Sequence, residues 1–226
     1  MNKTQATLRE ILGVLCQLQH NCWSAEDPRD QPKQITMDTY HLLMRSWLPV
    51  KREEIDKWFG DSSPMDIDLC GKRKAFYLPV LDEHPNFVPV LSVKCNLSAS
   101  VALLKLRLML FCSDDACDGL CGIGFRLETP RGGESDPHNF YHAQLIRTLE
   151  PPSRDEEEPD VECPVWVPET QPSFPLVAQS PVSLLLCLLM TLYGAVQGLN
   201  FVTGRQIFGL DPELQTLKAR MGLQPD

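Results

Sequence analysis

The chain has 226 residues, of which 43% are hydrophobic and 23% charged, a composition typical of a globular protein with one sizeable core and unlike that of a disordered chain. Its formal net charge is -9, from 30 acidic and 21 basic residues, so its overall field repels phosphate backbones and anionic lipid surfaces. Nucleic acid and membranes are therefore not expected as primary partners.

The first part of the chain favours helices. From Thr4, a predicted N-cap, apolar residues recur at three- and four-residue spacing, which predicts an amphipathic helix that packs on something. A second amphipathic helix is expected at about 37–47 and a short third one at 51–59. Residues 1–60 are therefore expected to form an N-terminal helical subdomain.

After a predicted loop at 60–71, the pattern changes to that of strands. Extended runs separated by turn-forming sequences occupy 76–81, 87–95, 101–112, 122–129 and 140–149. In the third run, apolar residues alternate with Lys105 and Arg107, which predicts a central strand with one apolar face. Pro79 and Pro89 remove backbone donors, so the first two strands are expected at a sheet edge or irregular. Short loops between successive strands favour an antiparallel meander.

The C-terminal part begins with an extended connection and continues with helices. Residues 150–175 concentrate prolines and carboxylates, which predicts an exposed, extended segment. Ser180 and Pro181 then predict the start, and Gly194 the end, of a helix that is apolar on every side. Such a helix is buried, and we expect it against the apolar face of the sheet. A last short helix is expected at 211–221.

The predicted fold is α+β: an antiparallel meander of four to five strands packed on the buried C-terminal helix. Residues 61–226 form this domain, and residues 1–60 the helical subdomain. The sequence shows neither a secretory signal nor an apolar run of the ~20 residues that cross a bilayer. Nine scattered cysteines, several within apolar patterns, are typical of reduced thiols. The expected location is the cytoplasm.

The stretch 112–142 holds the main candidates for chemistry. Thiolates and imidazoles that could bind zinc come from Cys112, Cys117, Cys121, His138 and His142. The C-x4-C-x3-C spacing lacks the close ligand pairs of structural zinc sites, and on a strand the two histidines would lie ~13 Å apart. We therefore expect no metal. The alternative is a metal-dependent or cysteine-based enzyme that uses Cys117 or Cys121 with His142.

Other chemical signatures are incomplete or absent. A calcium loop starting at Asp114 would have Ala116 at its third position and Phe125 at its twelfth, where a bidentate Glu is required. Serine-hydrolase, nucleotide-binding and zinc-protease motifs do not occur in the sequence. We expect no catalytic residue and no cofactor.

Aromatic side chains beside loops are candidate partner-binding residues, because Trp is enriched in binding hot spots. Trp58 follows a charged helical segment, and Val165, Trp166 and Phe174 lie in the proline-rich connection. An extended apolar strip with prolines docks readily on another surface. The alternative for each ring is that it closes the edge of the protein's own core.

Two segments, HNFYHAQLIRTLE and FPLVAQSPVSLLLCLLMTLYG, resemble segments of small accessory proteins encoded beside bacterial defence systems, including type III CRISPR loci. The similar segments contain no catalytic residue, and the resemblance implies a partner-binding or regulatory role. We therefore predict a non-enzymatic protein–protein interaction module, an adaptor or regulatory subunit of a cytosolic multi-subunit complex. The resemblance implies that this complex serves antiviral defence.

Overall fold

The computed structural model describes residues 3–23, 34–60, 66–80, 86–96, 103–113, 120–130, 139–146, 161–162, 173–194 and 210–222. This part of the chain is α+β, with five helices and a mixed sheet. The helices are α1 (Lys3–Trp23), α2 (Gln34–Ser46), α3 (Arg52–Gly60), α4 (Pro181–Tyr193) and α6 (Leu210–Arg220). None of these described helices combines the length and apolar composition that crossing a membrane requires.

The five helices predicted from the sequence are confirmed, and local chemistry explains the ends of α4. The Ser180 side chain accepts a hydrogen bond from the Ser183 N–H, and Ser183 reaches back to the Ser180 N–H, which satisfies donors at the helix start. Gly194 ends α4 with a φ of 79°, a conformation that glycine adopts without steric cost. The predicted role of Thr4 is wrong, because α1 already begins at Lys3.

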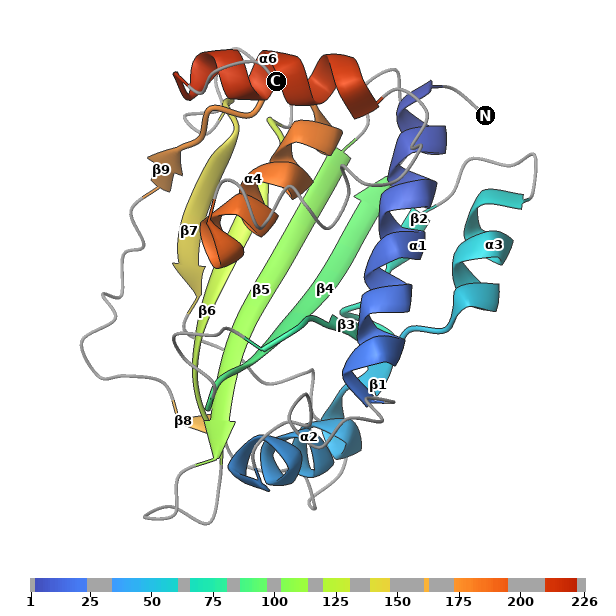
Figure 1. The fold of residues 1–226 in the computed structure, drawn as a ribbon, viewed down its shortest axis with the longest axis vertical. Coiled ribbons are helices and arrows are strands. Elements are labelled where there is room, and N and C mark those ends of the chain that lie inside the picture. Colours follow the sequence, from blue (N-terminus) through green and yellow to red (C-terminus); the bar gives the residue numbers. More distant parts are fainter. Residues whose placement is uncertain are drawn as a thin grey trace.

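The strands form a larger and more mixed sheet than the sequence predicted. They are β1 (Leu48–Pro49), β2 (Asp66–Asp68), β3 (Lys74–Tyr77), β4 (Val88–Asn96), β5 (Leu103–Ser113), β6 (Leu120–Glu128), β7 (His142–Ile146), β8 (Val161–Glu162) and β9 (Ser173–Pro175). The order is β1-β3-β4-β5-β6-β7-β9, with β2 beside β4 and β8 beside β6 (Figure 1). A strict meander of four to five antiparallel strands is wrong, because β1 and β8 pair in parallel.

Pro89 lies in β4, which pairs with strands on both sides, contrary to the prediction of an edge or irregular strand. The Leu78 N–H donates to the Pro89 carbonyl (2.9 Å), on the side of β4 that faces β3. A residue in an antiparallel strand directs its N–H and C=O to the same side. The position where Pro89 has no N–H is therefore on the side of β3, and no hydrogen bond to β5 is lost. Pairing of β3 ends at Tyr77, whereas β4 and β5 pair from Val88 to Asn96. The proline therefore stops one ladder without interrupting the other.

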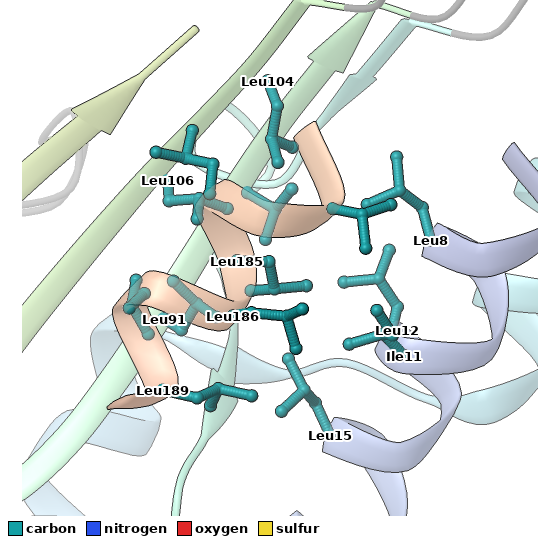
Figure 2. Close-up of a cluster of buried hydrophobic side chains, with 14 of the residues drawn as sticks. Leu8, Ile11, Leu12, Leu15, Leu91, Leu104, Leu106, Leu185, Leu186 and Leu189 are labelled. Atoms are coloured by element: carbon teal, nitrogen blue, oxygen red, sulfur yellow. The ribbon is translucent and has the colours of Figure 1, made fainter. Parts of the chain in front are cut away.

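One face of the sheet carries the main core. Leucines of α1, α4 and β5 meet there, as Figure 2 shows for Leu8, Leu15, Leu106, Leu186 and Leu189. In α4, every residue from Val182 to Met190 is buried, and the helix contacts β5 and β6. Of the helices in residues 1–60, α1 and α3 thus supply side chains to the same core cluster as the sheet.

The other face is covered at one end by α2. Tyr40 and Trp47, from α2 and the turn after it, join Met109 and Phe111 of β5 in a second buried cluster. The Tyr77 hydroxyl donates to the Trp47 carbonyl (2.6 Å), which fixes the end of α2 against β3. Both faces of β5 are therefore apolar around Met109 and Leu110, whereas its charged residues, Lys105 and Arg107, lie toward its start.

Candidate functional site

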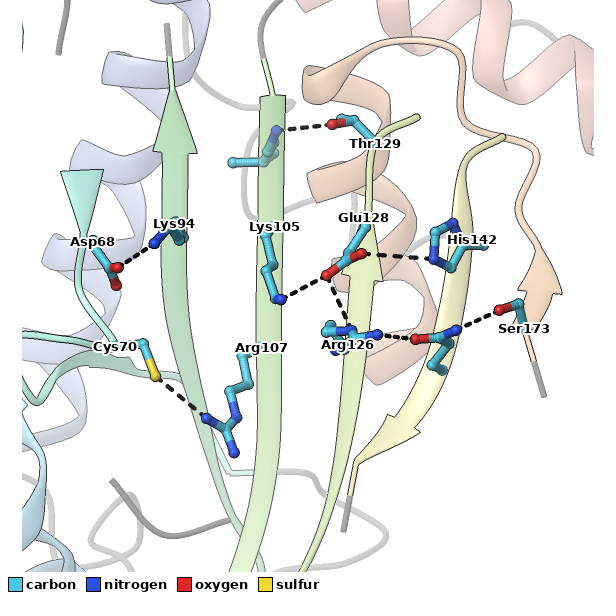
Figure 3. Close-up of polar contacts among 12 residues, drawn as sticks. Asp68, Cys70, Lys94, Lys105, Arg107, Arg126, Glu128, Thr129, His142 and Ser173 are labelled. Atoms are coloured by element: carbon cyan, nitrogen blue, oxygen red, sulfur yellow. Dashed lines mark hydrogen bonds and ion pairs between the residues drawn. The ribbon is translucent and has the colours of Figure 1, made fainter. Parts of the chain in front are cut away.

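Two rows of polar side chains cross the sheet on the face opposite α1 and α4 (Figure 3). In the first row, each residue is the register partner of the next one on the neighbouring strand, in the order Asp68, Lys94, Lys105, Glu128, His142. The second row, two residues along each strand, is Ser92, Arg107, Arg126, Gln144, Ser173. Because side chains alternate across a strand, all ten face the same side of the sheet.

Glu128 is the centre of the first row. One of its carboxylate oxygens, Oε1, lies 2.8 Å from Lys105 Nζ and 3.0 Å from Arg126 Nε. The Glu128 side chain is 6% exposed, whereas those of Lys105 and Arg126 are 36% and 30% exposed. A buried carboxylate needs such partners, because burial without them costs several kcal/mol.

His142 lies on the other side of Glu128. Its Nδ1 is 2.8 Å from the Phe140 carbonyl oxygen, and since a carbonyl only accepts, Nδ1 carries the hydrogen. Its Nε2 then faces Glu128 Oε2 at 3.8 Å, beyond hydrogen-bond distance. Both side chains are at most 6% exposed, which leaves little surface for a substrate. The pair connects β6 to β7.

The second row attaches the edge strand β9. Arg126 donates to the Gln144 side-chain oxygen, and the Gln144 amide donates to the Ser173 hydroxyl. Beside them, the Leu176 N–H donates to the Tyr141 carbonyl (2.8 Å). A strand of only three residues is thereby held to the sheet by side-chain and backbone bonds together.

At the β2 end, Asp68 pairs with Lys94 (2.5 Å), whose side chain is 52% exposed. Partial burial raises the pKa of Asp68, but the Gly71 N–H and the Lys94 ammonium lower it more, so it lies below its usual 3.8. The hydrogen bond and charge of Asp68 correspondingly raise the pKa of Lys94. The charges of this pair therefore stabilise each other.

A cleft of about 460 Å³ opens at the start of β5. Its lining residues are Asp66, Lys94, Asn96, Leu103, Leu104, Lys105, Glu128 and Thr129. Its two ammonium groups are already paired with carboxylates, Lys94 with Asp68 and Lys105 with Glu128. Both cations of the lining are thus already engaged in ion pairs.

The predicted cysteine and histidine set is not brought together. Cys112 and Cys121 are direct partners at one end of the β5–β6 pair, whereas His142 is opposite Glu128 at the other. Glu128 is the seventh residue after Cys121 along β6, or ~23 Å away at the usual strand rise. Cys117 and His138 lie outside the described residues. Within the described ranges, no group of three or more His, Cys, Asp or Glu side chains could hold a metal ion.

Of the predicted partner-binding residues that the structure describes, one is buried and one is exposed. Trp58 is 7% exposed and belongs to the main core, so its ring is not available as a surface anchor. Phe174 of β9 is 52% exposed. Val165 and Trp166 lie outside the described residues.

Phe174 has exposed apolar neighbours along the edge of the sheet. The side chains of Phe140, Val177 and Met221 are 37%, 43% and 42% exposed. Register continued from β7 and β9 places Phe140 beside Val177, and Arg220 donates to the Val177 carbonyl (3.3 Å), which brings the end of α6 alongside. By alternation, Phe140 and Val177 point to the same face of the sheet as Ser173, and Phe174 points to the other face, so the edge strand carries exposed apolar side chains on both faces. We call these four residues the β9 rim.

The roles of Arg126, Glu128, Gln144 and most of the β9 rim were not predicted from the sequence. The signal for the first three was present, because each alternates with apolar residues along its strand, as Lys105 does. Their convergence depends on strand register, which local patterns do not give. No protein-family model, curated protein or solved structure matches the chain.

Proposed function

We propose that this chain is a protein–protein interaction module, an adaptor or regulatory subunit that docks a partner protein on the β9 rim. The observation that carries the proposal is that Phe140, Phe174, Val177 and Met221, from three chain segments around the edge strand β9, are all exposed, with Phe174 on one face of the sheet and Phe140 and Val177 on the other. Single exposed apolar residues are ordinary, but grouped ones mark interaction sites.

The rim is held firmly, which favours binding because less ordering is needed when the partner arrives. Phe140 packs edge-on against the His142 ring, with ring centroids 5.4 Å apart. Phe174 lies on a strand fixed by the Gln144–Ser173 bond. Two aromatic rings are thus presented from anchored backbone, as in binding hot spots.

The partner is expected to contact side chains rather than add a strand. The Leu176 N–H points toward β7, so the backbone of the preceding residue, Pro175, points outward by alternation. A proline there has no N–H to offer, and prolines on edge strands prevent edge-to-edge pairing. An apolar surface on the partner is the fitting counterpart of the rim.

The net charge of this chain indicates which residues should surround the apolar surface of the partner. The chain has a formal net charge of -9, and residues 155–160, DEEEPD, lie shortly before β9 in the sequence. Opposite charge steers association and raises its rate at low salt. We therefore propose a partner with basic residues around an apolar patch, within a larger complex. The resemblance to defence-system accessory proteins supports a regulatory role of this kind.

The proposal can be tested by affinity capture from the native host, comparing wild type with Phe174→Asp. Leu48→Asp is the matched control, because Leu48 is 53% exposed on β1, at the opposite end of the strand order. A partner should be retained by wild type and control and depleted about tenfold or more by Phe174→Asp, the effect of ~1.4 kcal/mol. The retained protein must then bind the purified chain directly. If Phe174→Asp captures the same proteins in the same amounts, the proposal fails.

A further inference from the structure

Cys112 and Cys121 lie directly opposite each other on β5 and β6. The Thr129 N–H donates to the Leu104 carbonyl (3.0 Å) in the same ladder. Hydrogen-bonded pairs alternate along an antiparallel ladder, and Cys112 is an even number of residues from Leu104, so the cysteines form a hydrogen-bonded pair. Such pairs have Cα atoms about 5.5 Å apart, within the range of ~4.4–6.8 Å that a disulfide spans.

Both side chains point to the same face of the sheet because they are register partners. Each is half-buried, and in the described part of the chain both are thiols rather than a disulfide. They are thus close enough to react with each other and exposed enough for a small oxidant to reach.

The buried cysteines in the described residues are poorer candidates. Burial raises the pKa of Cys95 to about 12 and that of Cys187 to about 11, and it also raises the pKa of Cys16. Since the thiolate is the reactive form, these three sulfurs react slowly at neutral pH. Among the described strand pairings, only Cys112 and Cys121 place two cysteines opposite each other.

We propose that Cys112 and Cys121 are an oxidation site at which a peroxide forms an intramolecular disulfide between β5 and β6. One thiolate attacks a peroxide oxygen, so that an S–O bond forms, the O–O bond breaks and hydroxide leaves. The second thiolate attacks the resulting sulfenic sulfur, so that the S–S bond forms and the S–O bond breaks. With hydrogen peroxide, two thiols and one peroxide give one disulfide and two waters.

The cross-link would act where a third strand is attached. Leu120 and Cys121 also pair with Val161 and Glu162 of β8. The disulfide would therefore fix the end of β6 that pairs with β8. Hydrogen exchange at the Leu120 and Cys121 amides should become slower on oxidation, because opening of this end then has to move both strands.

The test is peptide mapping of the purified full chain after treatment with hydrogen peroxide and alkylation of the remaining thiols. Cleavage after Arg107 and Arg126 releases one peptide containing Cys112, Cys117 and Cys121. Cleavage before aspartates then separates the three cysteines, since Asp114, Asp115 and Asp118 lie between them. In wild type, the fragment containing Cys112 should be joined to the fragment containing Cys121. The joined pair should weigh two hydrogen masses less than the sum of the two reduced fragments.

Single variants assign the link. Cys117→Ser should form the same disulfide at the same rate, whereas Cys112→Ser or Cys121→Ser should abolish it. Cys70→Ser is a control that should leave the link unchanged. A link from Cys117 to either neighbour, or three alkylated cysteines in peroxide-treated wild type, would overturn the proposal. The wild-type map alone decides this, even where a variant folds poorly.

Discussion

Glu128 of β6 and Lys105 of β5 form an ion pair across the sheet, with the carboxylate oxygen 2.8 Å from the ammonium nitrogen. The carboxylate is buried and the ammonium is partly solvated. Arg126 and His142 complete the surroundings of Glu128, so one side chain couples β5, β6 and β7. Through Gln144 and Ser173, the same polar face also holds β9 and its rim.

Glu128→Gln should destabilise the protein by about 2 kcal/mol. The substitution keeps the shape but leaves Lys105 and Arg126 without their counter-charge; breaking a fully buried pair costs ~3–5 kcal/mol, and the partial exposure of both cations lowers this. Urea unfolding measures the change. Lys94→Gln, which breaks the exposed pair with Asp68, is the control and should cost less than about 1 kcal/mol. Equal effects of the two variants would contradict the role given to Glu128.

Leu189→Ala should cost about 2 to 5 kcal/mol, the usual range for a buried large-to-small change. Leu189 is fully buried in the main core (Figure 2). Thr191→Ala, at an exposed position of the same helix, should change stability by no more than about 0.5 kcal/mol. Chemical denaturation of both variants provides the comparison. A cost below about 0.5 kcal/mol for Leu189→Ala would show that α4 is not part of the core.

Acid should weaken the contact between α3 and β3. Burial raises the pKa of Glu54, but hydrogen bonds and charge from Lys74 and Lys51 lower it more, so it lies below its ordinary value of 4.5. The Glu54 carboxylate therefore contributes its full stabilisation of the folded state above pH 4.5. This contribution is lost as the pH falls through the pKa of Glu54 in the folded protein, which is lower than 4.5. Unfolding free energies measured across this range should fall less steeply for Glu54→Gln than for wild type. Glu53→Gln, an exposed neighbour, controls for the lost charge, and identical slopes for wild type and Glu54→Gln would contradict the prediction.

Purified protein should contain far less than one zinc per chain. Cys112 and Cys121 lie at the opposite end of β6 from the residue that faces His142, and two thiolates fall short of the four ligands of a structural zinc site. Elemental analysis decides this. About one zinc per chain, lost in Cys121→Ser, would show that residues outside the described ranges complete a site.

Helices and long strands could be predicted because periodicity reports burial directly. The helix 181–193 is apolar all round, and in the strand 101–112 Lys105 and Arg107 alternate with leucines. Strands β1, β2, β8 and β9 were missed, because two or three residues are too few to show a period. Trp58 was misplaced since a ring beside charged residues gives no sign of the core it enters.

The candidate surfaces were harder to predict than the fold. Phe174 was predicted as a partner-binding residue from its own segment, but Phe140, Val177 and Met221 join it only through the pairing of β7 with β9 and the placement of α6. The same holds for Glu128, whose partners come from neighbouring strands. Register and long-range packing decide both sites, and neither is encoded in a local pattern.

The affinity of a purified partner for the Phe174→Ala variant tests the central claim most directly. If the β9 rim is the docking surface, this change should weaken binding by about 2 kcal/mol or more, as truncation of a hot-spot residue does, and leave the thermal midpoint nearly unchanged because Phe174 is half-exposed. Leu48→Ala on β1 should bind like wild type. Full affinity of the Phe174→Ala variant for the partner would contradict docking on the β9 rim.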